Sequence, residues 1–285
     1  MKLIRLGEVG KEIPCVVIDD STDVFDARPI TTDFDPDFFS HGGLKQLQKA
    51  VSEGKLSRIP SAGQRIGAPL RRPEKIICIG LNYRNHAMES RMDEPKEPIV
   101  FMKAPNTLIG PNDNVMIPRK SLKTDWEIEL AVVINEKTSY LTSPDESAHV
   151  IAGYAISNDV SEREFQLERG GQWDKGKSCA TFNPLGPWLV TSDEISDPQH
   201  LQMFLDINSK RFQYESTSDM IFSVNYLVWY VSQFMVLEPG DIINTGTPAG
   251  VGLGQNPPHY LKPGDQMRLG IDGLGEQRSL VIATP

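Results

Sequence analysis

Short apolar runs typical of β-strands recur through most of this chain, whereas segments with helical periodicity are few. Seven such runs follow residue 75, at residues 76–79, 98–102, 127–134, 188–191, 201–207, 241–245 and 267–271. They do not alternate regularly with helical segments, as the strands of a doubly wound parallel sheet would. The sequence therefore predicts an α+β chain that is mostly β, built on a mixed sheet or roll.

The first seventy residues have a different pattern. Short strands are expected at residues 16–18 and 24–25, followed by an amphipathic helix over residues 43–53 with Leu44, Leu47 and Val51 on one face. The stretch RIPSAGQRIGAPLRRP that follows is rich in residues that interrupt helices and strands. We therefore expect a boundary near residue 70, with a small N-terminal α+β domain over residues 1–70 and a larger domain over residues 71–285.

Three later segments have recognisable local signals. A helix is expected to begin at Ser143, with Ser143 as its cap and Glu146 in the capping-box position. Residues 205–214 are typical of a hairpin that turns at Asn208 and Ser209. Residues 220–237 carry no charge, but their four polar side chains favour a buried helix over a membrane span.

Charge and cysteine content exclude several classes of protein. The formal net charge is −9 and no run of Lys or Arg forms a basic patch, so nucleic acid is not an expected partner. The three cysteines have no Cys-x-x-Cys spacing, which argues against a disulfide framework or a zinc site. The first ten residues contain no apolar stretch long enough for a signal peptide. The sequence therefore predicts a cytoplasmic protein with no membrane partner.

Two acidic residues alternate in the strand-like sequence WEIELAVVI. In a strand, Glu127 and Glu129 point to the same face, where two adjacent like charges need a neutralising partner. A third acid, Asp159, ends another apolar run. Three carboxylates without a nearby His or Cys form the kind of ligand set that Mg²⁺ or Mn²⁺ prefers. The alternative is a solvated outer face of the sheet, with the intervening apolar residues pointing inward.

Two further segments contain residues suited to acid–base chemistry. His86 and Glu89 are three residues apart, so on a helical turn the carboxylate can orient the imidazole as a base that activates water. A surface pair without function has the same spacing. Lys177 lies in a short turn near two glycines, where it could either stabilise an enolate or remain a solvated loop residue.

A cluster of glycines near the C-terminus, NTGTPAGVGLG, superficially suggests a phosphate-binding loop. Such loops open a helix directly after a strand. Here the glycines lead into Pro257 and Pro258, which cannot continue a helix. We therefore expect an irregular loop that lines a site, and not a cofactor phosphate site.

Taken together, these segments resemble the fumarylacetoacetate hydrolase superfamily over residues 73–283. The motifs that carry the resemblance occur in the family's order: GLNYRNHAMES, WEIELAVVI, SNDVSEREFQ, GGQWDKGKS, TFNPLGPWLVT and NTGTPAGVGLG. The resemblance implies a catalytic domain with a mixed β-sandwich roll, a small N-terminal domain, and a homodimer or a higher homo-oligomer.

The resemblance also implies roles for individual residues. Glu127, Glu129 and Asp159 are similar to the family's Mg²⁺ or Mn²⁺ ligands, and His86 and Glu89 to its catalytic dyad on a mobile lid. The lysine that faces the metal-bound substrate corresponds to Lys177. The substrate contacts correspond to Arg163, Gln166 and Thr247. One departure from the pattern is Ala180, where many similar members have Asp, and it leaves the surroundings of Lys177 open.

The activity implied is that of a metal-dependent hydrolase. Its substrate would be a small anionic 2,4-dioxo acid, either a 2,4-diketo-3-deoxy-sugar acid or an acylpyruvate, cleaved at a carbon–carbon bond to pyruvate and a second acid. The subgroup with GGQWxKGKS includes hydrolases of 2,4-diketo-3-deoxy-L-rhamnonate and proteins labelled ureidoglycolate lyase. Oxaloacetate decarboxylation and ureidoglycolate-lyase-like activity are alternatives, as is a catalytically silent metabolite-binding protein.

Overall fold

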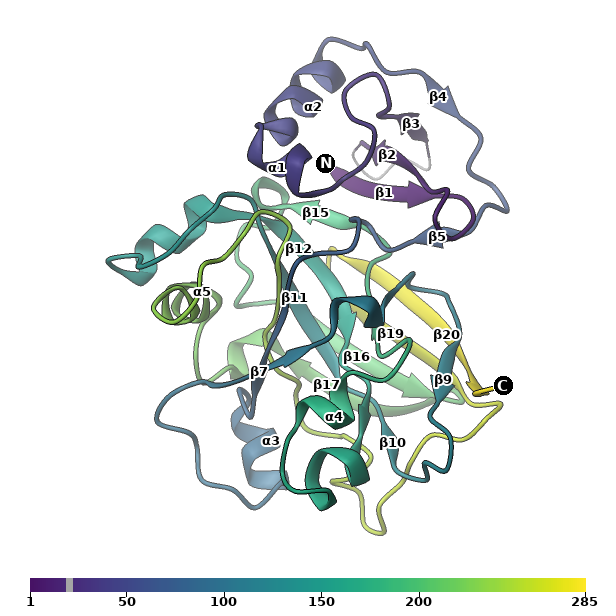
Figure 1. Ribbon diagram of the computed structural model, residues 1–285, viewed down its shortest axis with the longest axis vertical. Coiled ribbons are helices and arrows are strands. Elements are labelled where there is room, and N and C mark those ends of the chain that lie inside the picture. Colours follow the sequence, from purple (N-terminus) through teal and green to yellow (C-terminus); the bar gives the residue numbers. More distant parts are fainter. Residues whose placement is uncertain (19–22) are drawn as a thin grey trace.

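A computed structural model describes residues 1–18 and 23–285, and most of its core is β-sheet (Figure 1). The main sheet has eleven strands. In spatial order they are β4 (Arg58–Ile59), β3 (Val24–Asp26), β2 (Ile13–Val17), β1 (Lys2–Leu6), β15 (Leu189–Thr191), β12 (Ile151–Asn158), β11 (Ile128–Ile134), β18 (Ile242–Asn244), β6 (Ile76–Gly80) and β7 (Ile99–Lys103), with β5 (Ile66–Gly67) beside β1.

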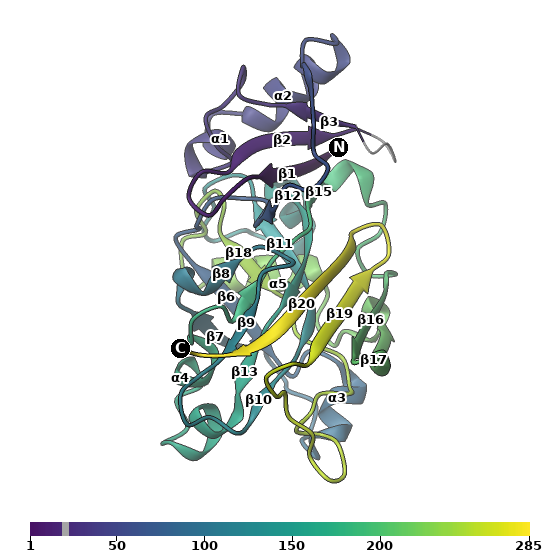
Figure 2. The ribbon, with the colours of Figure 1, turned by 90° about the vertical axis from the view of Figure 1, so that its right-hand side faces the viewer.

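A second sheet of five strands lies against the main one (Figure 2). It consists of β17 (Lys210–Ser216), β16 (Gln202–Ile207), β19 (Gln266–Ile271), β20 (Gly275–Ala283) and β9 (Val115–Ile117). Two short pairs complete the strands: β10 (Thr124–Asp125) with β13 (Ser161–Glu162), and β14 (Asn183–Pro184) with β8 (Leu108–Ile109). Parallel and antiparallel neighbours both occur, so the expectation of a mostly β chain with mixed sheets is confirmed.

The central strand β11 is buried on both faces. Ile128, Leu130 and Val132 belong to the apolar core that also contains residues of the second sheet. Ala131 and Val133 belong to a different core, which also holds apolar residues of the N-terminal region. Because side chains alternate along a strand, Glu129 shares the face of Ala131 and Val133. The two acids of WEIELAVVI therefore lie on the side of the sheet away from the main core.

The N-terminal elements extend the main sheet. Strand β1 was not anticipated from the sequence; it pairs with β15 through Lys2 opposite Val190 and Leu3 opposite Leu189. The strands expected at residues 16–18 and 24–25 are β2, which begins three residues earlier, and β3. Helices α1 (Pro36–Ser40) and α2 (Gly43–Ser52) follow, the second as predicted. The domain boundary near residue 70 stays a prediction.

The remaining helical segments are short. They are η1 (Pro105–Thr107), η2 (Pro144–Val150), η4 (Ser192–Glu194) and η5 (Thr217–Asp219), the π-helical turn η3 (Glu164–Glu168), and the α-helices α3 (Arg84–Glu89), α4 (Asp174–Lys177) and α5 (Val224–Ser232). Helix α3 lies at the end of the molecule opposite the N-terminal elements in both views (Figures 1 and 2).

The hairpin at Asn208 and Ser209 is confirmed, because both residues have the positive φ of a two-residue turn between β16 and β17. A helix begins where it was expected, with Ser143 in the N-cap position, but η2 is a 3₁₀-helix and the prediction that the Ser143 side chain caps it is wrong. Glu146 instead accepts hydrogen bonds from the N–H and the hydroxyl of Thr142, the residue before the expected cap.

The uncharged run at residues 220–237 contains a helix, but a shorter one than the run itself. Helix α5 spans only Val224–Ser232 and buries Leu227, Val228 and Val231 in the main core. Within residues 1–18 and 23–285, no helix has the length and apolar character needed to cross a bilayer.

Candidate active site

The three predicted metal ligands come together through the pairing of β11 with β12. Ile128 lies opposite Asn158, which places Glu127 across from Asp159, and the Asp159 N–H donates to the Glu127 carbonyl at 2.8 Å. Carboxylate oxygens of Glu127, Glu129 and Asp159 all lie within 4.8 Å of one another. All three side chains are at most 5% exposed, so the alternative of a solvated outer face is wrong.

Two buried lysines contact this cluster. The Nζ of Lys177 donates to Oε2 of Glu127 at 2.7 Å and to Oδ2 of Asp159 at 2.8 Å. The Nζ of Lys103 donates to the other oxygen of Asp159 and, at 3.0 Å, to the carbonyl of Val160. Both lysines are 1% exposed, so the interpretation of Lys177 as a solvated loop residue is wrong.

Arg163 supplies a third cation. Its Nη2 lies 2.7 Å from Oε1 of Glu127, and its Nη1 donates to Oε1 of Gln166 at 3.0 Å. Burial opposes ionisation of Glu127, but the charges of Lys177 and Arg163 outweigh it and hold the pKa of Glu127 at about 2. Glu127 is therefore a carboxylate at any physiological pH.

Glu129 differs from its two neighbours, because none of the ion pairs among the described residues involves it. It accepts one hydrogen bond, from the N–H of Gly246 at 2.8 Å. Burial, together with the charges of Asp159 and Glu127, raises the pKa of Glu129 well above its ordinary value. The cluster is thus short of positive charge at Glu129. An all-oxygen donor set with this deficit fits a divalent cation such as Mg²⁺ or Mn²⁺.

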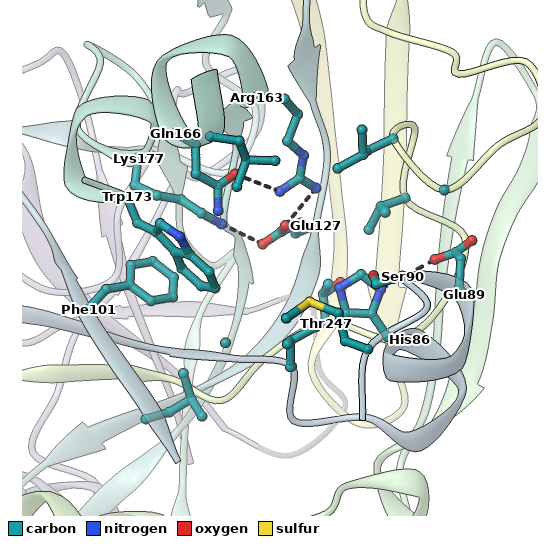
Figure 3. A pocket seen from close by; sticks show the side chains of 18 of the residues that line it. His86, Glu89, Ser90, Phe101, Glu127, Arg163, Gln166, Trp173, Lys177 and Thr247 are labelled. Atoms are coloured by element: carbon teal, nitrogen blue, oxygen red, sulfur yellow. Dashed lines mark hydrogen bonds and ion pairs between the residues drawn. The ribbon is translucent and has the colours of Figure 1, made fainter. Parts of the chain in front are cut away.

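His86 and Glu89 lie on α3, at the edge of the same cavity (Figure 3). The Nδ1 of His86 is 3.3 Å from Oε2 of Glu89. Glu89 also accepts the N–H of Gly250, at 3.0 and 3.1 Å to its two oxygens. His86 is 8% exposed, so the pair is not a surface pair. Because Nδ1 faces Glu89, Nε2 is the ring nitrogen left for other partners.

The cavity between these groups has a volume of about 380 Å³. Phe101 and Trp173 lie on one side of it, His86 and Thr247 on another, and Glu127 between them (Figure 3). Eight of the nine predicted site residues line the cavity, and Asp159 lies behind Lys177. The hydroxyl of Thr247 donates to the Ile128 carbonyl at 2.9 Å and accepts from Gln213 at 2.8 Å.

Several residues of the site were missed in the sequence. Lys103 follows a predicted strand, and nothing in its surroundings marks it as an internal counter-ion. Asp125 had a signal, because it alternates with Glu127 and Glu129. Phe101 and Trp173 pack edge to face, with ring centroids 5.3 Å apart.

Ala180 is exposed and makes none of the contacts that hold Lys177, so this departure from the family pattern leaves the lysine's partners in place.

The glycine-rich segment is an irregular loop, as predicted. Its backbone N–H groups bind carboxylates of the chain itself: Gly246 binds Glu129, Gly250 binds Glu89, and Gly252 binds Asp125. Backbone donors of the kind that bind phosphate in other loops thus hold three acids around the cavity.

Comparison with known proteins places this geometry among related chains. Residues 75–282 match the family described as fumarylacetoacetate (FAA) hydrolase, C-terminal. A curated protein of Burkholderia multivorans is 48% identical over 284 residues, covering 99% of each chain; its name says hydrolase, gives no substrate and is marked as provisional.

The solved structures that are similar over 100% of both chains include the following three. A fumarylacetoacetate hydrolase from Exiguobacterium antarcticum is 32% identical, with a TM-score of 0.87. Maleylpyruvate hydrolase from Sphingobium sp. SYK-6, in complex with manganese(II) and pyruvate, is 29% identical, with a TM-score of 0.81. A 5-carboxymethyl-2-hydroxymuconate delta-isomerase from Mycobacterium smegmatis is 29% identical, with a TM-score of 0.79.

Proposed function

This chain belongs to the fumarylacetoacetate hydrolase family, a family of enzymes, and from that premise we propose that it hydrolyses a carbon–carbon bond in a small 2,4-dioxo acid. The products are pyruvate and a second acid, and the reaction depends on Mg²⁺ or Mn²⁺. The observation that carries the proposal is the buried triad Glu127, Glu129 and Asp159, facing the His86–Glu89 pair across one cavity.

Glu127, Glu129 and Asp159 would hold the divalent ion. When bound, the ion supplies Lewis-acid polarisation of the substrate's carboxylate and 2-keto oxygens. The manganese and pyruvate in the maleylpyruvate hydrolase of Sphingobium support this assignment by similarity.

His86 is the base of the proposed reaction. Glu89 orients its ring, and Nε2 takes a proton from water as the water oxygen bonds to C4 of the substrate. Arg163 and Gln166 hold the oxyanion that forms at C4. The C3–C4 bond then breaks, its electron pair goes to C3, and the proton held by His86 is returned to C3 to complete pyruvate.

Lys177 acts as a cation in this scheme and not as a base. Burial opposes its charge, but Asp159 and Glu127 outweigh that effect and raise the pKa of Lys177 above its ordinary value. A lysine that keeps its proton can donate a hydrogen bond to the enolate oxygen of the departing pyruvate. It cannot accept a proton from water, which leaves that task to His86.

The proposal is tested by measuring pyruvate release from acetylpyruvate, a 2,4-diketo-3-deoxy-sugar acid and oxaloacetate. Each is assayed with Mg²⁺, with Mn²⁺ and with EDTA. We expect turnover of at least one 2,4-dioxo acid that EDTA abolishes and either metal restores. Turnover that persists in EDTA contradicts the proposed role of the metal. If no compound of the panel is turned over, the alternative of a catalytically silent metabolite-binding protein is favoured.

Metal binding is expected to release a proton. The raised pKa of Glu129 keeps its side chain protonated at pH values where a carboxyl group has ordinarily lost its proton. Because only the carboxylate binds a metal ion, Glu129 must release this proton when the ion binds. Apparent Mn²⁺ affinity should therefore fall as the pH falls, by up to about tenfold per pH unit while Glu129 is protonated.

Calorimetric titration with Mn²⁺ in two buffers of different ionisation enthalpy measures this release. We expect heats that differ between the buffers, by an amount that corresponds to about one proton released for each Mn²⁺ bound. The titration is repeated at several pH values between about 5.5 and about 8. Equal heats in the two buffers at every pH contradict the prediction.

A further inference from the structure

Asp125 is a fully buried carboxylate that does not line the cavity. Its Oδ1 accepts the N–H groups of Trp126 at 2.8 Å and Gly252 at 2.6 Å. Its Oδ2 accepts the N–H of Leu253 at 2.9 Å and Nε of Arg163 at 2.8 Å. One carboxylate thus joins the glycine loop to the arginine expected to contact the substrate.

The bond from Asp125 fixes the orientation of the Arg163 guanidinium. This group is planar, so once Nε is held by Asp125 the directions of its two terminal nitrogens follow. One nitrogen lies against Glu127 at 2.7 Å and the other donates to Gln166 at 3.0 Å. Both partners line the cavity, so Asp125 aims the guanidinium toward the space that a substrate would occupy.

The same carboxylate fixes the loop that reaches the acid–base pair. Gly252 and Leu253 donate to Asp125, and two residues earlier Gly250 donates to Glu89. The fit is close, since a Cβ at Gly252 would lie 2.7 Å from Oδ1 of Asp125. The position of the Gly250 N–H, and with it that of Glu89, therefore depends on the anchor at Asp125.

We propose that Asp125 is a positioning residue for the reaction, acting on substrate binding through Arg163 and on the His86–Glu89 pair through the glycine loop. This inference rests on the proposed function. It assigns Asp125 no contact with substrate or metal. Asp125 acts through Arg163, which contacts the substrate, and through the His86–Glu89 pair, which activates water.

The test compares Asp125→Asn with Asp113→Asn. An asparagine at position 125 keeps the size of the side chain but turns an N–H₂ group toward donors. We expect kcat/KM to fall about 100-fold, with KM raised and kcat lowered. Asp113 is a matched control: it also accepts bonds from an arginine, Arg65, and a backbone N–H, Gly110, but lies outside this cavity. Asp113→Asn should leave both constants unchanged.

A double-mutant cycle asks whether Asp125 acts through Arg163. In an Arg163→Ala background, adding Asp125→Asn should raise KM no further and should lower kcat by less than it does in the wild-type background, because only the effect through the glycine loop is left. If Asp125→Asn raises KM by the same factor with and without Arg163, the proposal is overturned. Wild-type activity in Asp125→Asn overturns it too. If that variant gives too little folded protein, Asp125→Glu, which keeps the charge opposite Arg163, takes its place.

Amide hydrogen exchange supplies a readout that needs no substrate. Exchange at residues 250–254 should be at least about tenfold faster in Asp125→Asn than in the wild type, and unchanged in Asp113→Asn. Equal exchange in all three proteins overturns the proposal. A wild type that releases no pyruvate from any keto acid refutes the proposed function, and the exchange result still decides whether Asp125 positions the loop.

Discussion

Glu129→Ala is expected to abolish metal-dependent turnover while leaving the fold intact. Loss of one ligand from three should lower kcat/KM by about 1000-fold, equivalent to about 4 kcal/mol of transition-state stabilisation. Glu129 is the most informative ligand to remove, because no cation in the part of the chain that the structure describes is paired with it. Removing Glu127 instead would leave Lys177 and Arg163 short of a counter-ion and would confound folding with activity.

Mn²⁺ binding, pyruvate release and thermal unfolding should be measured together. We expect Glu129→Ala to lose binding and turnover but still to unfold cooperatively, since the ion pairs of Lys177 with Glu127 and Asp159 are not touched. Glu136→Ala, an exposed acid just beyond the same strand, should match the wild type in all three. Retained Mn²⁺ affinity in Glu129→Ala contradicts the assignment of the triad.

His86→Ala is expected to separate hydrolysis from decarboxylation. Without the base, hydrolysis of a 2,4-dioxo acid should fall by about 100- to 10,000-fold. Decarboxylation of oxaloacetate needs no attacking water, so it should survive far better in the same variant. Mn²⁺ affinity should not change, because His86 is not one of the three carboxylate ligands.

His200→Ala provides the control for that experiment. His200 also pairs with an acid three residues away, with its Nδ1 2.6 Å from Oδ2 of Asp197, but this pair is exposed at the surface. It should retain full activity. Equal losses of both reactions in His86→Ala would show that His86 does not act by activating water.

Alternation and register explain how much of this site could be predicted. Glu127 and Glu129 follow the period of two that any strand imposes, and Asp159 ends the neighbouring strand, so the triad was within reach of the sequence. The His86–Glu89 pair followed from helical spacing. The alternation of Glu127 with Glu129 and the spacing of His86 and Glu89 are local rules. Asp159 was added because it ends a second apolar run, and the register that places it across from Glu127 was not deduced.

Lys103 shows where such rules stop. Its partner Asp159 is 56 residues away, and three strands lie between β7 and β12 in the main sheet, so the contact does not come from the pairing of neighbouring strands. No periodicity within residues 98–103 distinguishes a lysine that pairs with an internal acid from one that points to solvent. The three-dimensional course of the chain around the main sheet decides the matter, and that course was not deduced from the sequence. Strand β1 was missed for the same reason, because its position is set by β15.

The pairing of β1 with β15 also bears on how the chain is made. A ribosome synthesises Lys2 first, and its partner Val190 leaves the exit tunnel roughly 10 to 40 s later at about 5 to 20 residues per second. Until then, the newly made β1 has an unpaired edge, the kind of surface through which nascent chains associate. The yield of folded protein in a cell should therefore rise when that edge is shielded during translation, for example by chaperones.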